Sequence, residues 1–193
     1  MKVRDSGMPE REYWESLIEV PSVLDGLEID DAISEAVEVG CGYGTFTLPV
    51  AARIRGTLHA FDIEAAMIET TRLRLASGAT KNVRLHLRDV LACGFGLPAQ
   101  SMDAVLLFNI LHTENPMALL AASAALLRSS GRIFAVHWRS DVTTPRGPDL
   151  AIRPRPEQIV GWARALGLSV EEPRILPPWH FGVVLRPDNR APG

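Results

Sequence analysis

Residues 37–44 read VEVGCGYG, which places the carboxylate of Glu38 two residues before the first of three closely spaced glycines. A glycine turn that follows a buried strand and precedes a helix is a recurrent seat for nucleotide-like ligands at the carboxyl edge of a parallel sheet. Glycine permits the tight turn and lets backbone approach a ligand without an intervening Cβ. We therefore predict a ligand-binding loop between a strand over 36–39 and a helix that begins near Thr45.

The glycine spacing bears on which cofactor this loop binds. A dinucleotide fingerprint, Gly-x-Gly-x-x-Gly, would need glycine at position 45, where the chain has Thr45 and the third glycine comes one residue earlier as Gly44. Glu38 before the first glycine is also unusual for an NAD site, and no Tyr-x-x-x-Lys pair follows the fourth predicted strand. A nicotinamide oxidoreductase is therefore the less favoured interpretation.

Two aspartates follow the next two predicted strands. Asp62 ends the second strand, 22 residues after Gly40 (62 − 40), where a carboxylate can accept hydrogen bonds from both hydroxyls of a ribose. Asp62 would alternatively be the N-cap of a helix from Glu64 onward. Asp89 ends the third strand, and its alternative role is that of a turn aspartate that accepts bonds from its own backbone.

This pattern resembles motif I of the class I S-adenosylmethionine (SAM)-dependent methyltransferases, close to (V/L)-(D/E)-(V/L/I)-G-x-G-x-G, and the resemblance spans about residues 35–186. It implies SAM as cofactor and S-adenosylhomocysteine (SAH) as product. Asp89 and the backbone of Val90 would then contact adenine, Ile63 would pack on its face, and the carbonyl of Asn109 would bind the methionine amino group. Glu38 would balance the ammonium charge, directly or through water. The implied cofactor-binding residues are Glu38, Gly40, Cys41, Gly42, Gly44, Asp62, Ile63, Asp89, Val90 and Asn109.

The predicted acceptor side begins with residues 109–112, Asn-Ile-Leu-His, after the fourth strand. They differ from the Asn/Asp-Pro-Pro-Tyr signature of amino-methylating DNA enzymes, and a Leu-His at this place resembles UbiE-like and type 11 methyltransferases that act on small molecules. His112 and His137 are the candidate catalytic residues, because imidazole titrates near neutral pH. Both would alternatively be structural hydrogen-bond donors. Further aromatic candidates for the acceptor pocket are Trp138, Trp179 and His180.

Alternation of short strands and helices predicts an α/β fold, a doubly wound, mostly parallel seven-stranded sheet. The last two strands have too short a link for a crossover helix, so they form an antiparallel C-terminal hairpin. We expect one domain over 1–193, with a helical cap over 1–34 and an irregular loop over 139–155. The predicted strands are 36–39, 57–61, 83–87, 104–108, 132–136, 169–175 and 181–185. The predicted helices are 10–20, 27–34, 46–54, 64–76, 115–127 and 156–166.

The composition limits the classes of partner that we expect the protein to bind. A net charge of −3 and a pI near 6.0 give no electrostatic footprint for nucleic acid. Two cysteines form no disulfide framework and lack metal-ligand spacing, no signal peptide is evident, and no apolar run approaches the ~20 residues that span a bilayer. We expect a cytoplasmic monomer or small homo-oligomer, without a metal, that methylates a small or mid-sized molecule. A SAM-binding regulatory or complex subunit without turnover remains the alternative.

Overall fold

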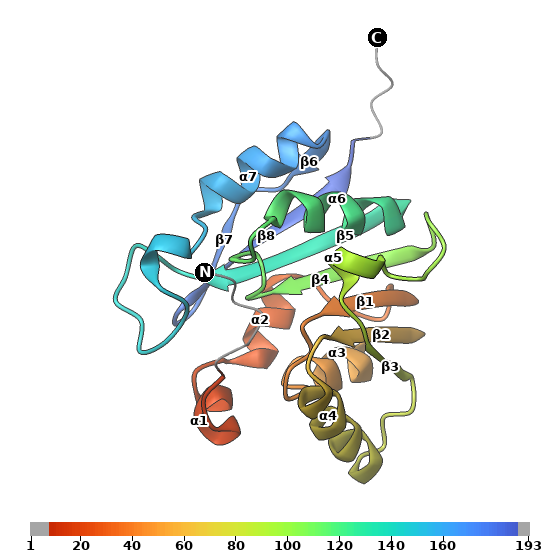
Figure 1. Ribbon diagram of the computed structural model, residues 1–193. Helices are drawn as coiled ribbons and strands as arrows, with labels where there is room; N and C mark the ends of the chain where they lie inside the picture. The colour runs from red at the N-terminus through yellow and green to blue at the C-terminus, as the bar shows by residue number, and fades with distance from the viewer. Residues whose placement is uncertain (1–7, 189–193) are drawn as a thin grey trace.

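The computed structural model describes residues 8–188, so residues 1–7 of the predicted cap and 189–193 of the predicted domain lie outside it. A central mixed sheet is flanked by α1–α4 on one face and by α5–α7 on the other (Figure 1). The helices are α1 Arg11–Ser16, α2 Val20–Gly26, α3 Thr47–Arg53, α4 Ala65–Ser77, α5 Val90–Cys93, α6 Pro116–Leu126 and α7 Pro156–Ala165, with a 3-10 turn at Leu150–Ile152. The strands are β1 Glu35–Val39, β2 Thr57–Asp62, β3 Val83–Leu87, β4 Met102–Phe108, β5 Leu127–Trp138, β6 Leu168–Val170, β7 Arg174–Leu176 and β8 His180–Pro187. None of the helices within 8–188 combines the length and apolarity needed to cross a bilayer.

The sheet runs in the order β3-β2-β1-β4-β5-β8-β6, with β7 also paired to β8. The first five strands of this order are parallel, and β8 is antiparallel to β5, which confirms the predicted fold class. Strand β4 lies at the centre and is buried on both faces, as an unbroken apolar run requires. The parallel strands therefore bring their carboxyl ends to one edge, together with the start of β8.

Several predicted boundaries were wrong. The predicted strand 169–175 is broken into β6 and β7, which both pair with β8, and Pro173 lies between them without an N–H to donate. The predicted helix 27–34 is absent, and the chain instead forms α2 over Val20–Gly26, with Pro21 in its first turn. The strand predicted over 132–136 begins earlier, at Leu127, so Gly131 lies inside β5, where a Cβ would come within 2.9 Å of a backbone oxygen of Met102.

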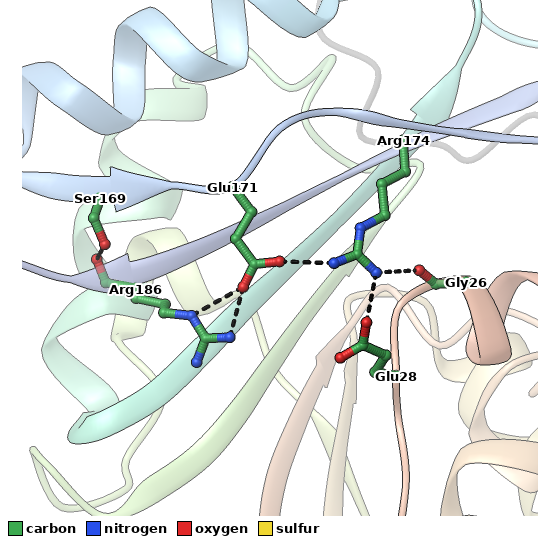
Figure 2. A network of polar contacts seen from close by, with 6 residues as sticks. All are labelled: Gly26, Glu28, Ser169, Glu171, Arg174 and Arg186. Carbon is green, nitrogen blue, oxygen red and sulfur yellow. Dashed lines mark hydrogen bonds and ion pairs between the residues drawn. The ribbon is translucent and has the colours of Figure 1, made fainter.

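A charged network ties the N-terminal cap to the last strands (Figure 2). Arg174 donates to the carbonyl of Gly26 at 2.8 Å and to Glu28 Oε1 at 2.9 Å. Its other nitrogen donates to Glu171 Oε2 at 2.9 Å, while Arg186 Nε donates to Glu171 Oε1 at 3.0 Å. The pairs are partly exposed, so each adds little stability alone, but the network fixes α2 against β7.

Candidate active site

The glycine loop turns immediately after β1 and keeps its own N–H groups occupied. The N–H groups of Gly40 and Cys41 both donate to the carbonyl of Phe61, at 2.8 and 3.0 Å, and the N–H of Gly42 donates to Asp62 Oδ2 at 2.9 Å. A dinucleotide loop instead offers such N–H groups to a pyrophosphate. The geometry therefore disfavours a phosphate-bearing ligand at this turn.

Backbone conformation explains why glycine is required here. Gly40, Gly42 and Gly44 have φ of 76°, 53° and 77°, in the left-handed region that other residues rarely adopt. A Cβ on Gly44 would lie 3.0 Å from atoms of both Leu48 and Thr71. The side chain of Cys41 is buried, so Cys41 offers a ligand backbone rather than a thiol.

Two buried carboxylates flank the loop. Glu38 is 2% exposed and accepts a 2.6 Å hydrogen bond from the hydroxyl of Thr47. Burial raises the pKa of Glu38 to about 8, opposed by the Thr47 bond and reinforced by the charge of Asp62. Burial also raises the pKa of Asp62, although N–H groups of Glu64 and Gly42 counter the shift by donating to its two oxygens. Both carboxyl groups are therefore harder to ionise than exposed carboxyls, and a bound cation would favour their ionised forms.

The residues predicted to contact adenine lie after β2 and β3. Ile63 is 46% exposed directly beyond Asp62, an unusual position for a large apolar side chain. Asp89 caps α5, where its Oδ1 accepts from the N–H groups of Leu91 and Ala92, both at 3.0 Å. The turn role weighed for Asp89 is therefore present, and no bond to Oδ2 is recorded within residues 8–188. Val90 is buried beneath this turn.

Asn109 follows β4 in a strained conformation. Its φ of 54° is left-handed, and its N–H donates to the carbonyl of Val136 at 2.8 Å. Its amide nitrogen lies 3.4 Å from Nε2 of His180, while its buried Oδ1 has no hydrogen-bond partner within the described chain. An unsatisfied buried oxygen is costly, and it is the kind of group that a bound ligand satisfies.

Three histidines lie near Asn109: His112 follows β4, His137 is in the last part of β5, and His180 begins β8. Nδ1 of His112 lies 3.3 Å from Nε2 of His137, which is fully buried. Burial, with a contribution from the charge of Arg153, lowers the pKa of His112, lowers that of His137 well below 6.5 and lowers that of His180 to about 4. All three imidazoles are therefore neutral near pH 7.

Helix α1 lies over the glycine loop and is bonded to it. The hydroxyl of Thr45 donates to Glu15 Oε1 at 3.3 Å, and Arg74 donates both to the same oxygen at 2.7 Å and to the carbonyl of Tyr43 at 2.6 Å. The hydroxyl of Tyr43 in turn donates to the carbonyl of Pro9 at 2.9 Å. These contacts hold the segment around α1 directly against the predicted cofactor loop.

The same segment reaches the acceptor side. Trp14 of α1 packs edge-on against Trp138 at the end of β5, with 6.1 Å between ring centroids. Met8 lies so close to the loop that a Cβ on Gly42 would be 3.2 Å from its sulfur. The segment from Met8 to Trp14 therefore bridges the glycine loop and the end of β5.

The irregular loop over 139–155 is held together by one buried arginine. Arg153 Nη1 donates to the carbonyl of Arg139 at 2.7 Å and to the hydroxyl of Thr144 at 2.9 Å. Its Nε and Nη2 both donate to the carbonyl of Pro148, at 3.2 and 2.8 Å. The loop is thus ordered around a guanidinium beside the end of β5.

Sequence reasoning missed several of these residues. Thr47, Glu15, Arg74 and Arg153 carry no motif, and their roles depend on contacts between distant parts of the chain. Two shallow hollows of about 520 and 510 Å³ lie at the opposite, amino-terminal edge of the sheet, around Arg128 and Arg55. Neither adjoins the loop or the histidines, so the site rests on the convergence of polar groups. Within residues 8–188, no three His, Cys, Asp or Glu side chains are arranged to bind a metal ion.

The fold and this arrangement of loop, carboxylates and strand ends are those of a class I methyltransferase. A family profile described as a methyltransferase domain matches residues 36–131. The crystal structure of a SAM-dependent methyltransferase from Aquifex aeolicus superposes with a TM-score of 0.80 at 16% identity, covering 91% of this chain and 93% of that one. Magnesium protoporphyrin IX methyltransferase from Synechocystis PCC 6803 with bound SAM gives a TM-score of 0.64 at 15% identity, with coverages of 88% and 76%.

A curated relative agrees with these matches. The ubiquinone biosynthesis O-methyltransferase of Xanthomonas axonopodis pv. citri (strain 306) is 26% identical over 165 residues, covering 75% of this chain and 66% of the relative. Together these findings identify the chain as a class I SAM-dependent methyltransferase, an enzyme whose methyl donor is SAM. The predicted family class and cofactor are thereby confirmed.

Proposed function

We propose that the protein transfers the methyl group of SAM to a small or mid-sized acceptor by in-line displacement. The observation that carries this proposal is the left-handed glycine loop between two buried carboxylates, Glu38 and Asp62, next to neutral histidines at neighbouring strand ends. Such a site offers an environment for a cation on one side and a proton acceptor on the other.

On the donor side, Asp62 would bind the ribose hydroxyls with the lone pairs that its two backbone bonds leave free. Ile63, Asp89 and the backbone of Val90 would hold adenine, since an exposed isoleucine and a free carboxylate oxygen lie there. The carbonyl of Asn109 would accept from the methionine ammonium, whose charge Glu38 would balance. The backbone of Gly40, Cys41, Gly42 and Gly44 would line the donor.

SAM supplies an electrophilic methyl group on a sulfonium, so the protein mainly contributes position and orientation. Such effects can reach ~7–11 kcal/mol of the barrier. His112 would accept a proton from an acceptor hydroxyl, because its imidazole is neutral and half-buried beside His137. If His112 Nδ1–H donates to His137 Nε2, its own Nε2 is left free to act as the base, and His137 fixes that tautomer.

We propose the same division of the chain as the sequence suggested, one domain over 1–193 with a cap over 1–34 and an acceptor loop over 139–155. The contacts of α1 with the glycine loop and of Trp14 with Trp138 support it. Trp179 and His180 would complete the acceptor side. A cytoplasmic location accords with the unpaired thiols of Cys41 and Cys93, and we propose a monomer or small homo-oligomer.

Calorimetric titration of the full-length protein with SAM and SAH tests the donor site. We expect binding in the wild type and at least about tenfold weaker binding in Asp62→Ala, since two charge-assisted bonds are lost. The matched control is Asp31→Ala on the exposed surface of the cap, which should bind as the wild type does. An absence of heat with the wild-type protein would refute the proposed donor site.

Incubation with methyl-labelled SAM and fractionated small-molecule extracts tests turnover. Mass spectrometry of the labelled product would identify the acceptor and the atom that receives the methyl group. SAM binding without any labelled product across a broad acceptor panel would instead favour a regulatory subunit.

A further inference from the structure

Arg153 is a buried cation without an anionic partner in the described chain. It is 7% exposed, and its four recorded hydrogen bonds go to the uncharged oxygens of Arg139, Pro148 and Thr144. No ion pair between Arg153 and a carboxylate is recorded among residues 8–188, although the charge of Asp149 partly counters the lowering of the Arg153 pKa by burial. Carbonyl dipoles offset part of the desolvation cost of a buried charge, but they do not neutralise it.

The position of this charge is fixed by close packing. Gly147 has a φ of 127°, and a Cβ there would lie 2.7 Å from Arg153 Nη2 and 3.0 Å from Trp138 Cγ. Trp138 in turn contacts the ring of His180, with 4.2 Å between centroids. Gly147 packs closely against both Arg153 and Trp138, so the guanidinium lies near the end of β5, on the predicted acceptor side.

The three histidines near Arg153 provide no compensating charge. It lowers the pKa of His112, His137 and His180, which places all three imidazoles within its electrostatic range. Burial keeps them neutral near pH 7, so the cluster carries one full positive charge. A guanidinium has five N–H groups, and one on Nη2 is left without a recorded bond.

The geometry points to an acceptor that carries a carboxylate or similar oxyanion, which Arg153 pairs with while His112 faces the atom to be methylated. This inference rests on the proposed methyl transfer and narrows its substrate class. The carboxylate of the donor's methionine moiety is another source of the same chemistry. Arg153 lies at the β5–β8 side, however, while the glycine loop follows β1, with β4 in between, so we assign the anion to the acceptor.

The test uses the full-length protein, with and without saturating SAH, and three matched probe pairs. These are 3,4-dihydroxybenzoate, 4-hydroxycinnamate and 4-hydroxyphenylacetate, each against its uncharged amide, with dissociation constants from ligand-observed NMR. We expect at least one acid to bind about tenfold more tightly than its amide in the wild type, since charge-assisted pairs are the strong ones. The preference should fall below about threefold in Arg153→Gln and persist in Arg164→Gln, an exposed control arginine on α7.

Equal binding of acids and amides by the wild type, or an acid preference that survives Arg153→Gln, would overturn the inference. So would Arg153→Gln weakening SAH about tenfold while leaving methylthioadenosine, which lacks the carboxylate, unaffected. If Arg153→Gln unfolds the loop, Arg153→Lys keeps the charge and must retain the acid preference. SAH binding reports separately on the donor site. If SAH binds normally but the acids bind no more tightly than their amides, only the anion site is refuted.

Discussion

We expect the affinity for SAM to depend on pH through the buried carboxyl of Glu38. Burial holds its pKa near about 8, so the ligand-free protein carries Glu38 largely as the neutral acid at pH 7. A bound ammonium or sulfonium favours the carboxylate, and binding must therefore expel this proton. The perturbation that isolates the effect is Glu38→Gln, which keeps the shape and the capacity to accept from Thr47 but has no proton to lose.

The magnitude follows from the pKa of about 8. Roughly nine-tenths of Glu38 is protonated at pH 7, so binding that ionises it fully releases about 0.9 proton there and about 0.1 at pH 9. Below about pH 7 the apparent affinity for SAM then falls by about tenfold for each pH unit. Between pH 8 and pH 6 the total fall is about 50-fold.

Calorimetry in phosphate and in Tris, whose ionisation enthalpies differ, counts the released protons. The donor's own amino group titrates at about 7.7–8.0, so the wild-type count must be compared with that of Glu38→Gln. We expect the variant to release about 0.9 fewer protons at pH 7 and to bind SAM more weakly at pH 9. Identical proton counts in the two proteins would refute the reasoning about Glu38.

The same shift acts on stability without ligand. The unfolded chain ionises Glu38 near 4.5 and the folded chain only near about 8. The stabilising contribution of the neutral acid is therefore complete below pH 4.5 and lost as the pH rises to about 8, at about 1.4 kcal/mol per unit. Urea unfolding should show this decline in the wild type and not in Glu38→Gln, and saturating SAM should restore the wild type.

Three further outcomes are expected. Gly44→Ala should lose about 1–3 kcal/mol in urea unfolding because its φ is left-handed and its Cβ meets neighbours at 3.0 Å, whereas Gly161→Ala, in a helix with open space, should lose nothing. Glu15→Gln should lower stability by at most about 1 kcal/mol but speed SAH release in stopped-flow, since its pair with Arg74 holds the cap; an unchanged release rate would argue against a covering role. Activity should fall with decreasing pH through the lowered pKa of His112, below 6.5, and this inflection should vanish in His112→Gln; its persistence would assign it to another group.

Local rules explain what could be predicted from sequence. The strand, glycine turn and helix of residues 37–54 lie in one contiguous stretch, so spacing alone located the turn at Gly40, Gly42 and Gly44, and the structure adds that all three are left-handed. The position of Asp62 beside the glycine loop was predictable, because a parallel strand that follows one helix ends at the same edge of the sheet. The start of β5 at Leu127, before the predicted start at 132, was not predictable, because the close approach of Gly131 to the backbone of β4 is a tertiary contact.

The sequence by itself determined the parallel sheet, the antiparallel C-terminal strand and the seat of the donor loop, because periodicity and turn residues act over a few neighbours. Only the tertiary structure decided that Glu15 and Arg74 join α1 to the glycine loop, and that Arg153 lies near three neutral histidines without an ion-pair partner in the described chain. Burial and charge at those positions are set by which distant segments pack together. No spacing along the chain encodes that arrangement.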